Sequence, residues 1–208
     1  MDSTKLRIMG LDLGQSTNPA SAAVLDKIDR EPPGLMGPPN PNYRPRLDCV
    51  SLKIWPLGTD YQDIVDDAIN LPCHFLVVDF GGVGRPVVDM LRRQAQLKHY
   101  PGKIRPVQLI GSLARASRKQ EARGSHWNIP KVDVVNSIVQ AQQQMWLSLP
   151  DMPETQVLLN QLRDFKMKIT KAANLQFGAT TTNDDIVIGL GLACWYALNY
   201  CRNAAIFA

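Results

Sequence analysis

The sequence predicts an α/β fold in which a mixed sheet of five or more strands, ordered 3-2-1-4-5, is flanked by helices. Three observations support this prediction. The chain has 208 residues, 45% apolar and 20% charged, as is typical of a globular protein with one domain. Its first three apolar segments follow one another without an intervening helix, which predicts an antiparallel meander. Later strands alternate with helices, the pattern of parallel β-α-β units with right-handed crossovers.

Apolar periodicity places the elements in order along the chain. The expected strands are 5–13, 20–28, 47–55, 74–80 and 104–110. The expected helices are 60–70, 85–96, 130–145, 153–164 and a buried helix that begins near 185. Asp60 fits the N-cap of the first of these helices, and Pro86 fits the first turn of the second.

Three segments are expected to lie outside this regular pattern. Residues 30–46 hold six of the fifteen prolines and are predicted to form a loop insertion within a single domain spanning 1–208. Residues 111–124 are predicted to form a basic loop. Alternation at 165–169, followed by 174–177, predicts a short hairpin.

Charge and cysteine content indicate which partners and which cellular compartment the protein can have. The 23 basic and 19 acidic residues leave a net charge of +4, which permits a nucleic-acid partner without requiring one. The four cysteines form no C-x-x-C pair and have no histidine at zinc spacing, so we expect buried thiols of a reducing compartment. The start of the chain has no signal-peptide pattern, and the apolar run at 186–201 is shorter than the ~20 residues a bilayer needs. We therefore expect a cytoplasmic protein.

Acidic residues close two of the predicted apolar strands. Asp12 and Asp79 would meet at the carboxyl edge of the sheet if strands one and four are neighbours. Asp184 and Asp185 open the last helix, from which a side chain can lean over the same edge. Three carboxylates without histidine or thiol favour Mg²⁺ or Mn²⁺, and two such ions promote phosphodiester hydrolysis. The alternative is that each aspartate is only a turn former or a helix cap.

Several motifs resemble those of a known family, the nuclease domain of the phage large terminase subunit, within the ribonuclease H-like superfamily. The resemblance spans nearly the whole chain. The motifs are GLDLG at 10–14, VVD at 77–79, GVGRPVVDML at 82–91, WNIPK at 127–131, LRDF at 162–165 and NDDIVI at 183–188, which leads to Leu192 and Ala193.

The resemblance implies an endonuclease that cuts concatemeric viral double-stranded DNA during genome packaging in the host cytoplasm. It implies that Asp12, Asp79 and Asp185 hold two Mg²⁺ or Mn²⁺ ions, with Asp184 as an accessory ligand. Family partners are an ATPase motor domain, the small terminase subunit and the portal. The chain has Asn183 where the family often has histidine, and it has no G-x-x-x-x-G-K-[ST] motor motif. An excised nuclease domain and a stand-alone relative both fit.

Basic residues near these acids are predicted to contact DNA phosphates. They are Arg115, Arg118, Lys119, Arg123, Lys166, Lys168 and Lys171. If 165–169 is a strand, Lys166 and Lys168 share a face, although scattered basic residues are usually only solvated surface. For Trp127 and His126, a core position is favoured over a wedge against DNA.

Three other classes remain as rivals. DLGQST at 12–17 and DFGG at 79–82 resemble the phosphate loops of actin-like and sugar-kinase-like ATPases, but that fold needs two lobes and a longer chain. GVGRPV at 82–87 is a poor dinucleotide motif because Val87 replaces its third glycine. A Holliday-junction resolvase shares the nuclease chemistry but acts as a dimer. We see no dimerising helix signature and expect a monomer.

Overall fold

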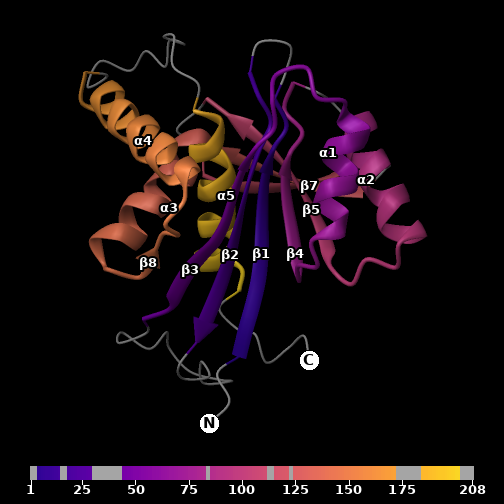
Figure 1. The fold of residues 1–208 in the computed structure, drawn as a ribbon, viewed down its shortest axis with the longest axis horizontal. Coiled ribbons are helices and arrows are strands. Elements are labelled where there is room, and N and C mark those ends of the chain that lie inside the picture. The colour runs from indigo at the N-terminus through magenta and orange to yellow at the C-terminus, as the bar shows by residue number, and fades with distance from the viewer. Residues whose placement is uncertain are drawn as a thin grey trace.

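The computed structural model describes residues 4–14, 18–29, 44–82, 85–111, 115–121, 124–171 and 184–201 (Figure 1). The strands are β1 Thr4–Asp12, β2 Ser21–Asp29, β3 Arg46–Ile54, β4 Phe75–Asp79, β5 Lys103–Ile110, β6 Ser117–Glu121, β7 Gly124–Pro130 and β8 Leu147–Ser148. The helices are α1 Tyr61–Asn70, α2 Arg85–Leu97, α3 Lys131–Gln143, α4 Pro153–Lys171 and α5 Asp185–Asn199.

All eight of these strands form one sheet in the order β6-β7-β5-β4-β1-β2-β3-β8. β1, β2 and β3 are antiparallel to one another, while β4 and β5 run parallel to β1. The central order β3-β2-β1-β4-β5 is the order that the sequence predicts. The sheet is wider than these five strands, as the prediction allowed, because β7 and β6 extend one edge and β8 the other.

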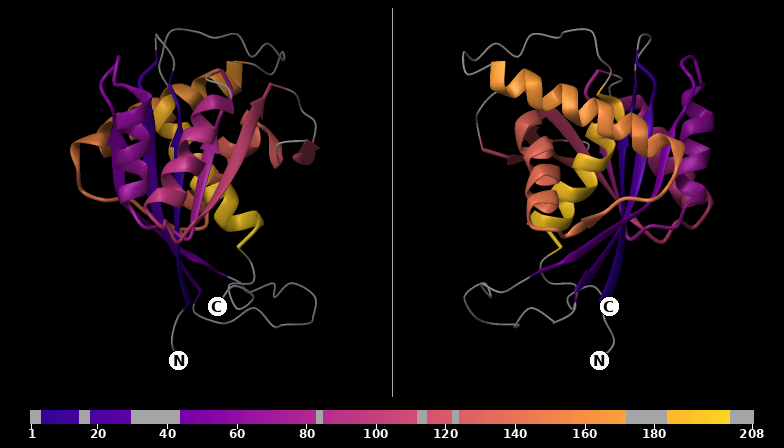
Figure 2. Two further views of the ribbon diagram at one scale, coloured as in Figure 1. Left: turned by 90° about the vertical axis from the view of Figure 1, so that its right-hand side faces the viewer. Right: turned by 60° about the vertical axis from the view of Figure 1, so that its left-hand side comes forward.

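Helices cover both faces of this sheet (Figures 1 and 2). α1 and α2 pack against one face, and α3, α4 and α5 pack against the other. α5 is the central helix of its layer, and every residue from Asp185 to Ala197 is buried, as predicted. Two apolar cores therefore sandwich the sheet, and side chains that alternate along each strand enter one core or the other.

Local expectations hold at several points. Asp60 caps α1 by accepting a hydrogen bond from the Gln62 backbone N–H at 2.9 Å, and Pro86 lies in the first turn of α2. All four cysteines are buried and unpaired. None of the helices in the described ranges is both long and apolar enough to span a membrane.

Two expectations are wrong. Residues 165–169 belong to α4 and not to a hairpin, while 174–177 lie outside the described residues. The expected basic loop at 111–124 contains β6 and the start of β7, which pair as an antiparallel hairpin at the sheet edge. An edge strand tolerates charged side chains on both faces, so its sequence lacks apolar alternation. Most of the proline-rich segment, 30–43, also lies outside the description.

Candidate active site at the carboxyl edge of the sheet

The pairing of β1 with β4 brings two aspartates side by side. Asp12 and Asp79 are Cα partners in the parallel register. Their neighbours Leu11 and Val78 both pack into the core under α1 and α2. Because side chains alternate along a strand, Asp12 and Asp79 both face the layer that contains α5. The sequence predicted this meeting, and the strand register confirms it.

A close helix-sheet contact places α5 over these residues. A Cβ on Gly10 would overlap the carbonyl oxygen of Gly189, so only glycine allows β1 and α5 to approach this closely. Asp185 lies one turn before Gly189, at the end of α5 that starts beside the carboxyl edge of the sheet (Figure 1). Asp12 follows Gly10 by two residues toward that same edge. The contact therefore positions Asp185 next to Asp12, and the charge of Asp185 acts on the Asp12 carboxyl group.

Lys131 supplies a positive charge at this acidic cluster. It is the first residue of α3, and its Nζ lies 2.7 Å from Asp184 Oδ2. Asp184 occupies the N-cap position of α5, but its side chain makes no capping hydrogen bond. The side chain of Asp184 therefore does not cap the helix, and the helix-cap alternative is wrong for this side chain. Its carboxylate is held by Lys131 instead.

The carboxyl groups of the cluster are hard to ionise. Burial, followed by the charges of Asp79 and Asp185, raises the pKa of Asp12 well above its ordinary value. Burial raises the pKa of Asp79 to about 6, although the backbone N–H groups of Gly81 and Leu109 and the charge of Lys131 act against this rise. Burial and the charge of Asp184 raise the pKa of Asp185 to about 6. The cluster thus holds more negative charge than Lys131 compensates.

Part of the turn-former alternative for Asp79 is correct. Its Oδ1 accepts a hydrogen bond from the Gly81 N–H at 2.8 Å, which fixes the turn after β4, and a longer one from Leu109 N–H at 3.4 Å. The same bonds hold the carboxylate in place at the sheet edge. A structural and a chemical role are compatible here.

Two buried oxygens at the cluster lack partners. Within the described residues, Asp185 Oδ2 and Ser21 Oγ have no hydrogen-bond partner. Ser21 is the Cα partner of Asp12 on β2, so its hydroxyl group points to the same face of the sheet. Buried oxygens without partners cost stability, and a ligand that binds there would recover it.

The donor set fits a hard divalent cation. In the described parts of the chain, no three histidine, cysteine or acidic side chains are grouped closely enough to hold a metal ion as they stand. The donors at the edge are nevertheless all carboxylate oxygens, the preferred ligands of Mg²⁺ and Mn²⁺. Excess negative charge and the unpartnered Asp185 oxygen favour the same ion. The assignment of Asp12, Asp79, Asp184 and Asp185 as ligands stays a prediction.

The basic residues predicted to bind DNA separate into two groups. Arg118 and Lys119 are exposed on the edge strand β6, Arg115 is exposed just before it, and Arg123 lies outside the described residues. The expected strand at Lys166 and Lys168 is wrong, because Lys166, Lys168 and Lys171 belong to α4; the prediction that these lysines contact DNA stays a prediction.

The core interpretation of the aromatic pair before α3 is confirmed. Trp127 packs against Trp195 and Tyr200, with ring centroids 6.2 and 4.6 Å away. His126 is buried, and its ring meets that of Phe80 edge-on at 5.3 Å. Both side chains therefore pack within the layers around β7, His126 buried and Trp127 half-buried.

Two residues of the site carry little signal in the sequence. Lys131 follows a proline at the start of a helix, like many lysines, and only the packing of α3 against α5 brings it to Asp184. Ser21 is a polar residue opening an otherwise apolar strand, which is a weak signal. Its position beside Asp12 follows from the antiparallel register of β1 and β2.

Comparison with known proteins gives limited further information. No family model matches the sequence, and no curated protein matches it. Among solved structures, the chain is similar to that of Thermus thermophilus RuvC, with 8% sequence identity, 95% of this chain and 96% of that chain covered, and a TM-score of 0.40. Similarity at this level assigns neither a family nor an activity, so the chemistry of the site rests on its own geometry.

Proposed function

We propose that the chain is a metal-dependent endonuclease that cuts double-stranded DNA at the carboxyl edge of its sheet. One observation carries the proposal: the strand register and the Gly10–Gly189 contact gather Asp12, Asp79 and Asp185 on one face. An unpaired buried carboxylate lowers the free energy of unfolding by roughly several kcal/mol. A cluster of such carboxylates therefore points to a bound cation. The same edge is flanked by the exposed basic residues Arg118 and Lys119.

Each residue has a distinct proposed role. Asp12, Asp79 and Asp185 would hold the metal, Asp185 through its unpartnered oxygen. A pair of Mg²⁺ or Mn²⁺ ions, if bound there, would supply water activation and charge neutralisation at the scissile phosphate. Lys131 exchanges Asp184 for a phosphate oxygen of the DNA, which leaves Asp184 as an accessory ligand.

Plasmid cleavage tests this chemistry. Wild-type protein with Mn²⁺ should nick or linearise supercoiled DNA, excess EDTA should stop the reaction, and Asp79→Asn should abolish it while the protein stays folded. Asp63→Asn, at an exposed position on α1, is the matched control and should cut normally. Cleavage in EDTA, or undiminished cleavage by Asp79→Asn, contradicts the proposal. ATP binding by calorimetry without DNA cleavage would favour the actin-like or sugar-kinase-like ATPase.

The finer proposal is that the DNA is concatemeric viral DNA, cut during genome packaging. Its support is the resemblance of the sequence motifs to the terminase nuclease domain. Linear duplex and four-way junction substrates distinguish this from the other nuclease candidate. Equal or better cleavage of the duplex supports the packaging role, whereas strong preference for the junction replaces it with a Holliday-junction resolvase and leaves the metal chemistry in place.

A further inference from the structure

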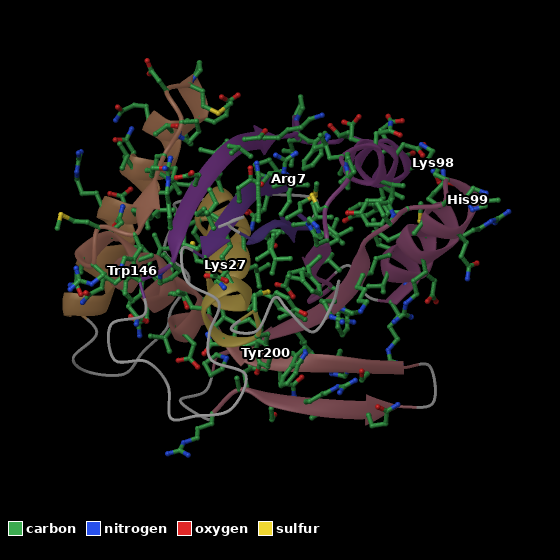
Figure 3. All side chains as sticks on the ribbon, turned by 90° about the horizontal axis from the view of Figure 1, so that it is seen from below. Arg7, Lys27, Lys98, His99, Trp146 and Tyr200 are labelled. Carbon is green, nitrogen blue, oxygen red and sulfur yellow. The ribbon has the colours of Figure 1, made fainter. Side chains whose placement is uncertain are left out.

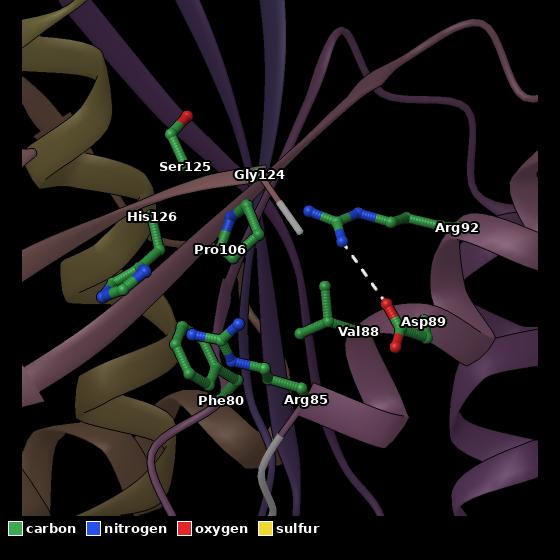
Figure 4. A pocket seen from close by; sticks show the side chains of 9 residues that line it. All are labelled: Phe80, Arg85, Val88, Asp89, Arg92, Pro106, Gly124, Ser125 and His126. Carbon is green, nitrogen blue, oxygen red and sulfur yellow. Dashed lines mark hydrogen bonds and ion pairs between the residues drawn. The ribbon is translucent and has the colours of Figure 1, made fainter. Parts of the chain in front are cut away.

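A small pocket opens on the face of the sheet opposite the acidic cluster. It lies between α2 and the strands β5 and β7 (Figure 4). Phe80, the residue after Asp79, lines it together with Pro106, and Arg85 and Arg92 reach it from α2. Because side chains alternate, Asp79 and Phe80 face opposite sides of the same sheet edge. The pocket and the acidic cluster therefore lie on either side of one edge.

The charges around the pocket favour an anion. Arg85 and Arg92 are seven residues apart on α2, so they lie on the same side of the helix, two turns apart. Asp89 offsets part of this charge, with its Oδ1 3.4 Å from Arg92 Nη1, but both side chains are substantially exposed and such a pair is weak. Lys119 on β6 is close enough for its charge, with that of Arg85, to act on the buried His126.

We propose that this pocket, the α2 notch, binds a backbone phosphate of double-stranded DNA through Arg85 and Arg92. The proposal rests on the proposed nuclease function. A DNA strand that crosses the carboxyl edge from the acidic cluster toward β6 passes the α2 notch, which fixes its position without reading bases. Arginine is suited to this role because its fork of donors matches phosphate oxygens.

Fluorescence anisotropy with a labelled DNA duplex in EDTA tests the α2 notch without cleavage. Arg85→Ala and Arg92→Ala should each weaken binding by about fivefold and reduce the slope of log affinity against log salt by about 1. Arg93→Ala is the matched control, because Arg93 is exposed on the same helix and absent from the pocket lining. It should bind like wild type.

A second variant separates phosphate binding from a structural role. Asp89→Asn removes the acid beside Arg92 and should tighten DNA binding by about twofold. This gain should vanish when Arg92→Ala is also present. A purely structural role of Arg92 predicts no gain, and melting temperatures of all variants identify any that are unfolded.

The outcomes distinguish this inference from the function on which it rests. If Arg92→Ala binds DNA as tightly as Arg93→Ala and wild type still cuts plasmid, the α2 notch is wrong and the nuclease stands. If wild type neither binds the duplex nor cuts plasmid with Mn²⁺, both fail. Weaker binding by Arg85→Ala and Arg92→Ala alone, with the Asp89→Asn gain, supports the α2 notch.

Discussion

Buried aspartates occur at both ends of the sheet, but among the described residues only those at the end away from the acidic cluster are matched by basic side chains. There, both carboxylate oxygens of Asp26 bind Arg7, at 2.7 and 2.9 Å, and one also lies 2.6 Å from Lys5 Nζ. The fully buried Lys27 binds Asp29 at 2.6 Å and the Cys201 carbonyl oxygen at 2.5 Å. Figure 3 shows Arg7 and Lys27 at this end.

The carboxyl edge presents the opposite arrangement. Asp12, Asp79 and Asp185 have raised pKa values, chiefly because of burial, whereas the hydrogen bonds from Arg7 and Lys5 outweigh burial and leave the pKa of Asp26 below its ordinary value. The fold thus neutralises buried acids where they serve structure. At the carboxyl edge the fold leaves the buried acids without enough positive charge, and a bound ligand explains this arrangement better than a structural role does.

The largest expected effect comes from neutralising one acid at each end. Asp79→Asn should lower DNA cleavage on the order of 10⁴-fold. It should also raise the melting temperature in EDTA, because a carboxyl group whose pKa is raised in the folded state destabilises the fold once ionised at neutral pH. Asp29→Asn should do the reverse, with a lower melting temperature and unchanged cleavage. A similar loss of stability in both variants would break the comparison.

The next largest effect is expected on stability, when the buried lysine is removed. Lys27→Met leaves Asp29 buried without this lysine and should cost about 3–5 kcal/mol in the free energy of unfolding. Urea denaturation measures the change. The double variant Lys27→Met, Asp29→Asn should recover part of it, since the buried charge is removed with its partner. If Lys27→Met alone is neutral, the ion pair contributes little to stability.

The sequence predicts the central sheet and the meeting of its two aspartates for the same physical reason. Asp12 and Asp79 each end an apolar strand, and the crossover rule that makes those strands neighbours also puts their ends at one edge. The meeting of the two aspartates thus follows from local sequence patterns and one rule of sheet topology. Both can be read without knowing any side-chain contact.

The failures occur where local alternation and tertiary packing disagree. Five alternating residues at 165–169 imitate a strand, but Leu158, Leu162 and Phe165 continue a helical stripe that is buried in the core. Packing of that stripe extends α4 past the predicted end. Lys131 ends the WNIPK motif, but its pairing with Asp184 could not be predicted because it depends on where α3 meets α5, which no sequence spacing specifies.

A third prediction concerns Lys131, the cation of the acidic end. Lys131→Gln should bind Mn²⁺ about tenfold more tightly by calorimetry, because the substitution removes a positive charge from Asp184 and from the neighbourhood of Asp12 and Asp79. Lys131→Arg keeps the charge and should bind like wild type. Unchanged Mn²⁺ affinity in Lys131→Gln would place metal binding away from this cluster.

The smallest expected effect is a dependence on pH at the paired end. Because the folded-state pKa of Asp26 is lowered, its ion pairs with Arg7 and Lys5 stabilise the fold above the ordinary pKa of about 4, and this stability is lost as pH falls through the lower folded value. Asp26→Asn should remove that part of the acid dependence, at a cost near 1 kcal/mol at neutral pH. Urea midpoints for wild type and Asp26→Asn should therefore converge below pH 4. Curves that stay parallel down to pH 2 would mean that another group carries the acid sensitivity of this end.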